Sequence, residues 1–558
     1  MPRFNAPPPP YARATYALRA KDIVEVLCHR KNAGAEEYLV RWAIGGQAGP
    51  RARCSWHTLP ELWRVLYLVQ EYIESRLQPD RTSETSSDAL QLPALPQNRK
   101  RKSPDPDHAS PRERRGERNE ILRPNGLLTP HDNLSQASRA SSVMSVGSSL
   151  EAAHASSGPD NNELRLYGVT LRKKEGHLLA QKCNESPLLN PSKLPEDWLQ
   201  TASITPVDQA ERFMRQKFLE MIKPVGNVRL ENKIDSTTPS LNFTFIDRYV
   251  FQNGIYVTPI EAVEGCPAPC RANMGGFCGC EYTQKCGCLE YAAVDEINLQ
   301  KKDGEVYEAW KKAREDRVHF DSLGLPKRFP YSKKSKDAGA HRPQTLVSYY
   351  LESRNIIYEC NQNCNCGPVC KSRLVQKGRK VPLTVFKTKD RGWGVKCDEY
   401  LVRGEFIDTY LGEVISQEEA DRREEKAGEM KNSYFFGLDK FTRDPNYAAF
   451  ADIDPDDCHV VDGQHMGGPS RFINHSCEPN CRQYTVSYNK NDPYVYNLAF
   501  FAYDNIPAGE ELTFDYMDGD EEEEEEAVRR REEALRDPAN AHKIRCNCGA
   551  RKCRGFLW

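Results

Sequence analysis

Short-spaced cysteines are the residues of this chain whose chemistry can be read first. Ten of its 20 cysteines lie within 266–288 and 360–370, some of them only two positions apart. Thiolates this close suit a compact cluster in which sulfur atoms bridge metal ions, and zinc takes four such ligands. Three zinc ions need about twelve sulfur contacts, which nine thiolates supply when three of them bridge. The candidate ligands are Cys266, Cys270, Cys280, Cys286, Cys288, Cys360, Cys364, Cys366 and Cys370, with Cys278 as the tenth candidate.

A second cysteine group lies near the end of the chain. Cys546, Cys548 and Cys553 are one ligand short of a tetrahedral zinc site. Cys477, in the stretch RFINHSCEPNC, is the candidate for the fourth ligand. This zinc ion would hold the C-terminal tail over that stretch and build one wall of a pocket. We expect Cys397, Cys458 and Cys481 to be core residues instead.

The composition supports zinc over disulfides. The 558 residues carry a net charge of −2, are 39% hydrophobic and have a mean hydropathy of −0.72. No apolar run reaches membrane-spanning length, and the start MPRFNAPPPPYARATY lacks the apolar core of a signal peptide. We therefore expect an intracellular protein with reduced thiols, in which only local patches of charge could attract nucleic acid.

The elements that must position these residues begin with a small module at 20–76. The stretches DIVEVLCHRK and EEYLVRWAI have the composition of strands, and NAG (Asn32–Gly34) suits a hairpin turn between them. The stretch LWRVLYLVQEYIESRL has apolar residues at helical spacing and predicts a closing helix.

A Ser-, Pro- and Arg-rich linker at 77–160 is expected to be disordered. Its basic clusters, Arg99–Lys102 and Arg112–Arg118, are equally typical of a solvated tail and of a nuclear-import or nucleic-acid patch. The region 161–245 is mixed, with a helix predicted at DQAERFMRQKFLEMI.

Beyond residue 245 the chain reads as a compact region that continues to Trp558. One segment at 518–541 interrupts it, and its high charge and lack of aromatic residues predict a mobile insert. Its acidic run could regulate access of a basic peptide or could be a passive linker.

Four separated motifs occur in order: GWGV (Gly392–Val395), RFINHSCEPN (Arg471–Asn480), ELTFDY (Glu511–Tyr516) and CNCGARKCRGFLW at the end. Together they resemble the SET-domain protein lysine methyltransferases. The earlier cysteine clusters resemble a pre-SET domain (246–378), followed by the SET domain (379–517) and a post-SET tail (542–558). With both flanking regions present, the chain is similar to the suppressor-of-variegation class, which methylates lysine 9 of histone H3.

The resemblance implies a mainly β fold with some α structure, in which strands thread through one another as a pseudoknot. RFINHSC and ELTFDY would lie side by side at its centre. S-adenosylmethionine would bind on one face and the peptide on the other, with the target lysine in a channel between them. Structural zinc ions would number three in the pre-SET region and one in the post-SET tail.

Roles for single residues follow from the same resemblance. Tyr516 would be catalytic, because its hydroxyl can orient the amine, and Tyr410 and Phe514 would line the channel. The residues expected to hold the cofactor are Gly392, Trp393, Gly394, Tyr434, Arg471, Asn474 and His475. Outside this motif set, Tyr516 would read as a core tyrosine and the GWG stretch as a turn.

The N-terminal module resembles a chromodomain, a small sheet with a helix that binds methylated lysine in an aromatic cage. Trp42 occupies one cage position, whereas Asp22 and Gly45 occupy the other two. Tyr16 or Trp56 could substitute for a missing ring. The alternative is a chromo-like fold used for packing or for another partner.

These observations predict a nuclear, chromosomal enzyme that methylates lysine 9 of histone H3 to the di- or trimethyl state in heterochromatin and gene silencing. Its expected partners are the histone H3 tail or nucleosome, a ligand of the chromo-like module, and nucleic acid at the basic linker; no membrane is implied. Two rivals are a methyltransferase for a non-histone lysine and an inactive chromatin-binding scaffold. The intact set Tyr410, Asn474, His475 and Tyr516 favours an enzyme.

Overall fold

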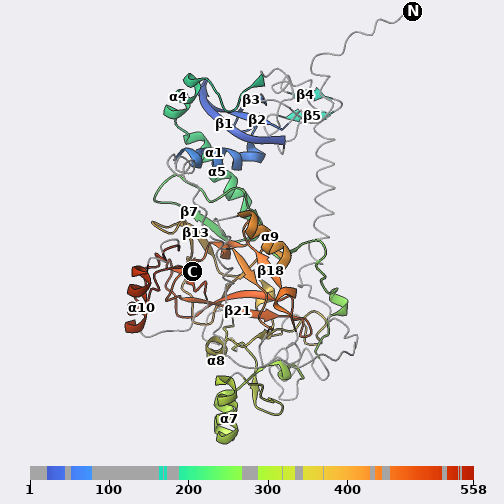
Figure 1. Cartoon of the computed structure of the whole chain (residues 1–558). Coiled ribbons are helices and arrows are strands. Elements are labelled where there is room, and N and C mark those ends of the chain that lie inside the picture. Colours follow the sequence, from blue (N-terminus) through green and yellow to red (C-terminus); the bar gives the residue numbers. More distant parts are fainter. Residues whose placement is uncertain are drawn as a thin grey trace, which may run out of the picture. The chain divides into compact units, whose positions relative to one another are not determined.

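The computed structural model describes residues 22–43, 52–77, 163–166, 169–172, 188–266, 287–316, 318–332, 344–367, 370–427, 434–442, 453–517, 524–537, 540 and 543–557. These residues divide into two compact units (Figure 1). The first takes in the described residues up to 77 together with 163–221 and 235–242, and the second takes in the rest. Among the described helices, none is both long and apolar enough to cross a bilayer.

The first unit is built on an antiparallel sheet with the strand order β1-β2-β3-β6. Its strands are β1 (Ile23–Asn32), β2 (Ala35–Trp42), β3 (Ala52–Thr58) and β6 (Leu188–Leu189). The predicted hairpin turn is confirmed, because Ala33 and Gly34, between β1 and β2, have φ angles of 47° and 81°. The predicted helix is also confirmed, as η3 (Trp63–Val65) followed by α1 (Leu66–Leu77). A separate hairpin consists of β4 (Glu163–Leu166) and β5 (Val169–Arg172).

Two helices from much later in the chain complete this sheet. They are α4 (Glu196–Ile204) and α5 (Asp208–Met221), the second of which the sequence predicted. Ala202 of α4 packs with the buried side chains of Cys28, Leu39 and Cys54 from the three long strands. The residues between 188 and 221 thereby enlarge the hydrophobic core of the small sheet and its helix.

A buried carboxylate ties α5 to the sheet. Glu36 on β2 is 3% exposed. Its carboxylate accepts hydrogen bonds from the backbone N–H groups of Gln209 (2.7 Å) and Ala210 (3.0 Å) and from the Tyr38 hydroxyl (2.8 Å). The first N–H groups of a helix have no partner within the helix, and its N-terminus favours negative charge. Glu36 therefore caps α5 from another element.

Trp42, which the sequence analysis expected at a cage position, is only 2% exposed. Its indole Nε1–H donates to the Ser55 hydroxyl at 2.8 Å, and its ring packs edge-on against His57. Its face is therefore not presented to solvent as a cage wall would be. Asp22, at another cage position, lies at the start of β1, whereas Gly45 and Tyr16 lie outside the described residues.

The second unit contains most of the secondary structure. Its strands are β7 (Val228–Glu231), β8 (Thr244–Phe245), β9 (Val250–Phe251), β10 (Ala293–Val294), β11 (Lys327–Arg328), β12 (Ile357–Tyr358), β13 (Leu383–Lys387), β14 (Trp393–Cys397), β15 (Phe406–Tyr410), β16 (Glu413–Ser416), β17 (Phe435–Gly437), β18 (His459–Asp462), β19 (Met466–Gly467), β20 (Asn474–His475), β21 (Cys481–Ser487), β22 (Asn497–Ala502) and β23 (Glu511–Phe514). Its α-helices are α6 (Glu296–Lys302), α7 (Gly304–Glu315), α8 (Ser348–Ser353), α9 (Gln417–Ala427) and α10 (Glu524–Arg536). Its 3₁₀ helices are η5 (Lys223–Val225), η6 (Ile260–Ala262), η8 (Gly287–Tyr291), η9 (Val375–Lys377), η11 (Pro455–Asp457) and η12 (Pro469–Phe472).

The strands form three larger sheets with the orders β12-β21-β22-β15, β20-β23-β14-β13-β7 and β17-β18-β16-β9, beside the pairs β10-β11 and β19-β8. The last strand, β23, lies between β20 and β14. It runs parallel to β20, where Asn474 pairs with Thr513 and His475 with Phe514. The two motifs therefore lie side by side, as the sequence predicted.

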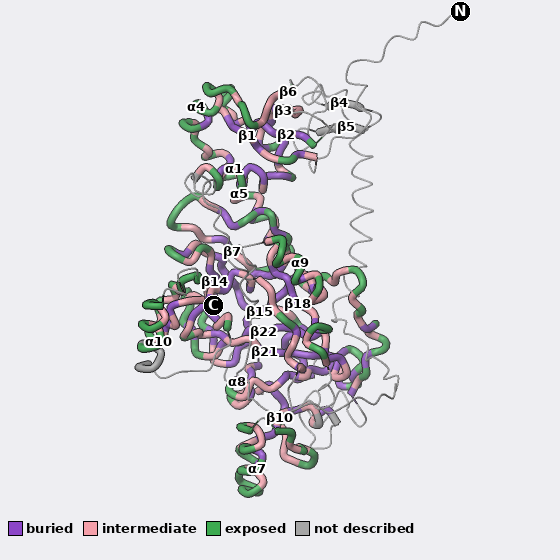
Figure 2. The backbone as a smooth tube through the Cα atoms, viewed as in Figure 1, coloured by how far each residue is buried: buried purple, intermediate pink, exposed green. Residues whose placement is uncertain are grey.

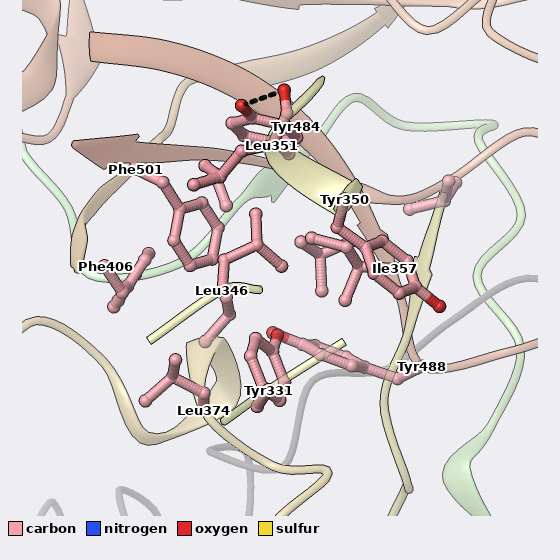
Figure 3. Close-up of a cluster of buried hydrophobic side chains, with 14 residues drawn as sticks. Tyr331, Leu346, Tyr350, Leu351, Ile357, Leu374, Phe406, Tyr484, Tyr488 and Phe501 are labelled. Atoms are coloured by element: carbon pink, nitrogen blue, oxygen red, sulfur yellow. Dashed lines mark hydrogen bonds between the residues drawn. The ribbon is translucent and has the colours of Figure 1, made fainter. Parts of the chain in front are cut away.

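A hydrophobic cluster joins the cysteine-rich half of this unit to its sheets (Figure 3). Tyr350 and Leu351 of α8 and Ile357 of β12 pack against Tyr484 of β21 and Phe501 of β22. The Tyr484 hydroxyl donates to the Leu351 carbonyl oxygen at 2.9 Å. Buried residues concentrate in the strands, whereas α7, α9 and α10 present exposed faces (Figure 2).

The charged segment at 518–541 contains a helix, α10, where the sequence predicted a mobile insert. Its run of Glu, Ala, Leu and Arg has high helix propensity, and Glu532 and Arg536 form an i,i+4 ion pair. A Cβ atom at Gly555 would lie 3.1 Å from Cγ of Arg531 and 3.8 Å from Cγ of Leu535. The helix therefore packs directly on the C-terminal tail.

Candidate active site

Two tyrosines, the buried Tyr410 and the half-buried Tyr516, anchor the centre of the second unit. The Tyr516 hydroxyl donates to the Ile473 carbonyl oxygen at 3.0 Å, and the Tyr410 hydroxyl donates to the Tyr434 carbonyl oxygen at 2.7 Å. Each phenol O–H donates its hydrogen bond to a carbonyl oxygen, so the lone pairs of the phenol oxygen remain available to accept hydrogen bonds. Burial raises the pKa of both tyrosines well above the usual value, which keeps both phenols neutral.

Aromatic rings surround these two hydroxyl groups. Phe514 lies 4.8 Å from Tyr516 between ring centroids and 4.8 Å from Phe500. Phe436 lies 5.0 Å from Tyr410 and 6.1 Å from Phe514. Tyr410, Phe514 and Tyr516 thus lie in one aromatic cluster, the arrangement that the sequence expected for a channel. An apolar site of this kind disfavours a charged ammonium and lowers the pKa of a lysine that enters it.

The Asn474 amide is held by the strands around it. Its Nδ2 donates to Glu511 Oε1 at 2.9 Å and to the Trp393 carbonyl oxygen at 3.2 Å. Arg391 in turn forms an ion pair with Glu511 and donates to the His475 carbonyl oxygen at 3.4 Å. The amide oxygen of Asn474 is thereby turned away from Glu511, because both donor contacts fix the NH₂ end.

The GWG stretch depends on its two glycines. Gly392 has a φ of +67°, which favours glycine. A Cβ atom at Gly394 would lie 2.7 Å from Glu511 Oε1 and 3.0 Å from Thr388 Cγ2, so a larger residue would displace the Glu511 carboxylate that holds Asn474. This close packing brings the Trp393 backbone and Asn474 together, at the position expected for the cofactor. The Trp393 ring has the Lys387 amine 5.2 Å from its centroid.

Arg471 and Tyr434 form a packed pair at the edge of this cluster. The Arg471 guanidinium lies 4.3 Å from the Tyr434 ring centroid and 4.4 Å from that of Phe243. Its Nε donates to the Gly463 carbonyl oxygen at 3.0 Å. Arg471 therefore fixes the loop that presents the Tyr434 carbonyl to Tyr410, in addition to any contact with a cofactor.

His475 is 4% exposed, and both of its ring nitrogens have partners within the protein. Nε2 lies 3.2 Å from Cys477 Sγ, and Nδ1 accepts the backbone N–H of Tyr516 at 3.2 Å. Burial lowers the pKa of His475, which favours the neutral imidazole. Its ring thus contacts the candidate zinc ligand Cys477, whose group already has four cysteines, the number of ligands that tetrahedral zinc needs.

The four cysteines expected to hold the post-SET zinc ion come together. Sγ atoms of Cys477, Cys546, Cys548 and Cys553 all lie within 4.8 Å of one another. Tetrahedral zinc with Zn–S bonds of about 2.3 Å needs sulfur atoms roughly 3.8 Å apart, so this set fits. The tail is also held by Arg554, whose guanidinium donates to Asp515 Oδ1 at 2.5 Å.

The described cysteines of the pre-SET group also converge. Cys266, Cys360, Cys364 and Cys366 have Sγ atoms within 4.8 Å of one another. Cys288 Sγ lies 2.9 Å from Cys266 Sγ, and Cys370 Sγ lies 3.8 Å from Cys360 Sγ. Cys270, Cys278, Cys280 and Cys286 lie outside the described residues.

Polar groups around this sulfur cluster suit a zinc–thiolate site. Backbone N–H groups of Cys266 and Asn361 donate to Cys364 Sγ, each at 3.2 Å. Hydrogen bonds from neighbouring groups lower the pKa of the Cys364 thiol, and the largest effect comes from the Cys266 side chain. The buried Arg373 guanidinium lies 3.7 Å from Cys366 Sγ and supplies positive charge beside the thiolates. Stabilised thiolates at ligand spacing are what zinc requires.

Cys397, Cys458 and Cys481 are buried and lie outside both ligand groups, which confirms them as core residues. Burial raises the pKa of Cys397 to about 11 and that of Cys458 to about 12. Sequence reasoning missed Phe436, Glu511 and Arg391. Each of the three lies near a motif or an expected site residue: Phe436 comes two residues after Tyr434, Glu511 begins ELTFDY, and Arg391 precedes GWGV.

Comparison with known proteins places these sites in one family. Residues 392–517 match the SET domain and residues 222–373 match the Pre-SET motif. The histone-lysine N-methyltransferase, H3 lysine-9 specific dim-5, of Neurospora crassa is 37% identical over 337 residues, which cover 59% of this chain and 88% of that protein.

A second relative is the histone-lysine N-methyltransferase, H3 lysine-9 specific, of Schizosaccharomyces pombe. It is 32% identical over 373 residues, covering 66% of this chain and 61% of that protein. A solved structure of the Neurospora SET domain protein DIM-5, a histone lysine methyltransferase, aligns with 53% of this chain and 97% of its own, at 34% identity and a TM-score of 0.41. The matched regions include the aromatic cluster, the β20–β23 pair and the first cysteine group, and the chain belongs to the SET-domain histone-lysine N-methyltransferases.

Proposed function

We propose that this protein transfers methyl groups to lysine 9 of histone H3 and forms di- and trimethyl-lysine in heterochromatin. The observation that carries the proposal is the pair of neutral phenols, Tyr410 and Tyr516, inside a buried aromatic cluster beside Asn474. The name of the Neurospora crassa relative supports H3 lysine 9 as the target. The nucleus and the chromosome are the corresponding location.

S-adenosylmethionine supplies an electrophilic methyl group to an attacking amine. The residues of the chain must therefore make the lysine neutral, orient its lone pair and exclude water. The rings of Phe436, Phe500 and Phe514 provide the apolar surroundings that favour the neutral amine. The Tyr410 and Tyr516 oxygens, with their protons committed to carbonyl groups, can accept the amine N–H groups and leave its lone pair free to attack.

The residues proposed to hold the cofactor fall into two groups, according to the contacts that their side chains make within the protein. The Asn474 amide is oriented by Glu511, and the Gly392–Gly394 backbone packs closely beside it. These groups suit direct contact with the cofactor. Arg471 and Tyr434 would affect cofactor binding indirectly, through the loop that they hold in place. His475 would contact the cofactor through its backbone, because its ring nitrogens already have partners in the protein.

The product state follows from the ring at position 514. Phe514 is 5% exposed and has no hydroxyl group that could hold a water molecule beside the lysine nitrogen. The volume of that water is then free for a second or third methyl group. This argument favours di- and trimethylation over a stop at the monomethyl state.

The basic clusters of the linker and the N-terminal module are proposed to contribute contacts with chromatin. The burial of Trp42 argues against a cage built on that residue. The module therefore fits better as a packing or docking domain than as a strong methyl-lysine reader.

The test is transfer of tritiated methyl groups to histone octamer and to H3 peptides in which each lysine in turn is replaced by arginine. We expect label on octamer and loss of label only when lysine 9 is replaced. The matched control is Tyr516→Phe, which keeps the ring and removes the hydroxyl, and which should lose most activity. Label that survives replacement of lysine 9 would point to another lysine, and no label on any protein substrate would identify an inactive scaffold.

A further inference from the structure

One imidazole connects the post-SET cysteine site to the catalytic tyrosine. His475 lies on β20, beside β23, and its two ring nitrogens face opposite ways. Nδ1 meets the backbone nitrogen of Tyr516 at 3.2 Å, and Nε2 meets Cys477 Sγ at 3.2 Å. The ring is buried, so these contacts are shielded from water.

The Tyr516 contact decides which nitrogen carries the proton. A backbone N–H can only donate, so Nδ1 must accept and is unprotonated. The proton of a neutral imidazole then lies on Nε2, which points at Cys477. The histidine therefore donates a hydrogen bond to the sulfur atom of a zinc-ligand candidate.

Asp515 is the other group near Nδ1, with Oδ1 at 3.5 Å. That oxygen already accepts hydrogen bonds from Arg554 at 2.5 Å and from the Met517 backbone N–H at 2.9 Å. Both contacts are shorter than the one to His475. The carboxylate is thus occupied by the tail and the main chain, and Nδ1 serves Tyr516.

We infer that His475 is a positioning residue that links the zinc-bound tail to Tyr516 through two directed hydrogen bonds. The link has two halves with separate consequences. The Nε2–H donor stabilises the Cys477 thiolate and so retains the metal ion. The Nδ1 acceptor fixes the Tyr516 main chain, while the Ile473 carbonyl fixes its hydroxyl.

The two halves can be separated by substitution. Asparagine places an amide oxygen near the position of Nδ1 but reaches no further, so His475→Asn keeps the acceptor for Tyr516 and loses the donor to Cys477. Glutamine reaches the position of Nε2, so His475→Gln keeps the donor and loses the acceptor. His465→Asn is the matched control, because His465 is exposed and only its backbone carbonyl accepts a hydrogen bond, from Thr244.

The first measurement is the rate at which full-length, zinc-loaded protein releases zinc to the chromogenic chelator 4-(2-pyridylazo)resorcinol. Removal of such an outer partner typically weakens metal binding roughly 10- to 100-fold. His475→Asn should release one zinc ion per chain about that much faster, with the remaining zinc unchanged. His475→Gln and His465→Asn should release zinc at the wild-type rate.

The second measurement is kcat and KM for methyl transfer, and only this measurement rests on the proposed function. His475→Gln should lower kcat, because Tyr516 is misplaced, with zinc retained. His475→Asn at saturating zinc should lower kcat less than His475→Gln does, because it keeps an acceptor for the Tyr516 backbone N–H. Identical behaviour of the Asn and Gln variants in both measurements, or wild-type zinc release from His475→Asn, would overturn the inference. A wild-type protein without activity would refute the proposed function, and the zinc measurement would still decide the link.

Discussion

The Tyr410 hydroxyl lies directly against Gly463. A Cβ atom on Gly463 would lie 2.4 Å from the Tyr410 hydroxyl oxygen and 2.9 Å from its Cζ atom. Because Tyr410 is only 4% exposed, its ring cannot swing into solvent to make room. Gly463 therefore fixes the position of the Tyr410 ring, which forms one side of the aromatic cluster.

This contact predicts that Gly463→Ala displaces Tyr410 and lowers kcat/KM. A misplacement of about 1 Å can cost roughly 100-fold in rate, so we expect a loss of 10- to 100-fold in a folded protein. Steady-state kinetics with circular dichroism to verify folding would measure it. Gly304→Ala is the control, since nothing lies within 4 Å of a Cβ there. Wild-type kinetics for Gly463→Ala would contradict the role given to Tyr410.

Phe514→Tyr is expected to shift the product towards monomethyl-lysine without loss of the first transfer. The new hydroxyl could hold a water molecule in the volume that further methyl groups need. One hydrogen bond is worth roughly 1 kcal/mol, which changes the partitioning about five- to tenfold at each step. Mass spectrometry of reaction products under excess cofactor reports the distribution. A wild-type enzyme that stops at the monomethyl state would show that the argument from Phe514 is wrong.

Cys553→Ser is expected to remove one zinc ion of four and abolish activity while most of the fold remains. The serine hydroxyl is a poor replacement for a thiolate ligand, so the tail would detach from Cys477. Metal analysis, activity and thermal unfolding on the same preparation would follow the three effects. Cys458→Ala, at a buried cysteine outside the ligand groups, should keep all the zinc. Active wild-type protein that contains no zinc would refute this account.

Asp408 gives a pH dependence of stability. Burial raises its pKa to about 6, above the value of 3.8 in the unfolded chain. As the pH rises from 4 to 6, the unfolded chain releases this proton first, so the contribution of Asp408 to folding stability falls by as much as about 3 kcal/mol. Below pH 4 both states keep the proton and the loss disappears.

Asp408→Asn keeps the shape and removes this titration. The stability of the variant relative to the wild type should therefore increase between pH 4 and pH 7. Parallel unfolding of both proteins in the same zinc-containing buffers isolates the difference from the pH dependence of the zinc sites. A difference that stays constant over this range would mean that Asp408 ionises normally in the folded protein.

The sequence was sufficient where one local pattern identified a chemical role. The cysteine spacing predicted both sulfur groups, and the NAG turn predicted the first hairpin. In these two, residue type and spacing alone carry the physical constraint. The placement of Asn474 and His475 beside the strand that ends at Phe514 was implied by the family resemblance instead.

Long-range contacts could not be read in the same way. Phe436 lies two residues after Tyr434, but that spacing does not indicate that its ring lies between Tyr410 and Phe514. The role of Glu511 depends on Asn474 and Arg391, which come from two other segments. Likewise the acidic run at 518–541 was expected to be mobile, although its helix packs on Gly555. Such pairings depend on the complete fold rather than on any single stretch.

The cap that Glu36 places on α5 has a consequence for synthesis of the chain. The three long strands of the sheet that carries Glu36 end at Thr58, whereas α4 and α5, the helices that complete its core, begin only at Glu196 and Asp208. Synthesis proceeds at about 5–20 residues per second, so many seconds pass before α5 can bind the Glu36 carboxylate. During that time part of the apolar face of the sheet stays uncovered. The nascent N-terminal unit thus keeps part of its apolar surface exposed until α4 is synthesised, and the length of the intervening segment sets the duration of that exposure.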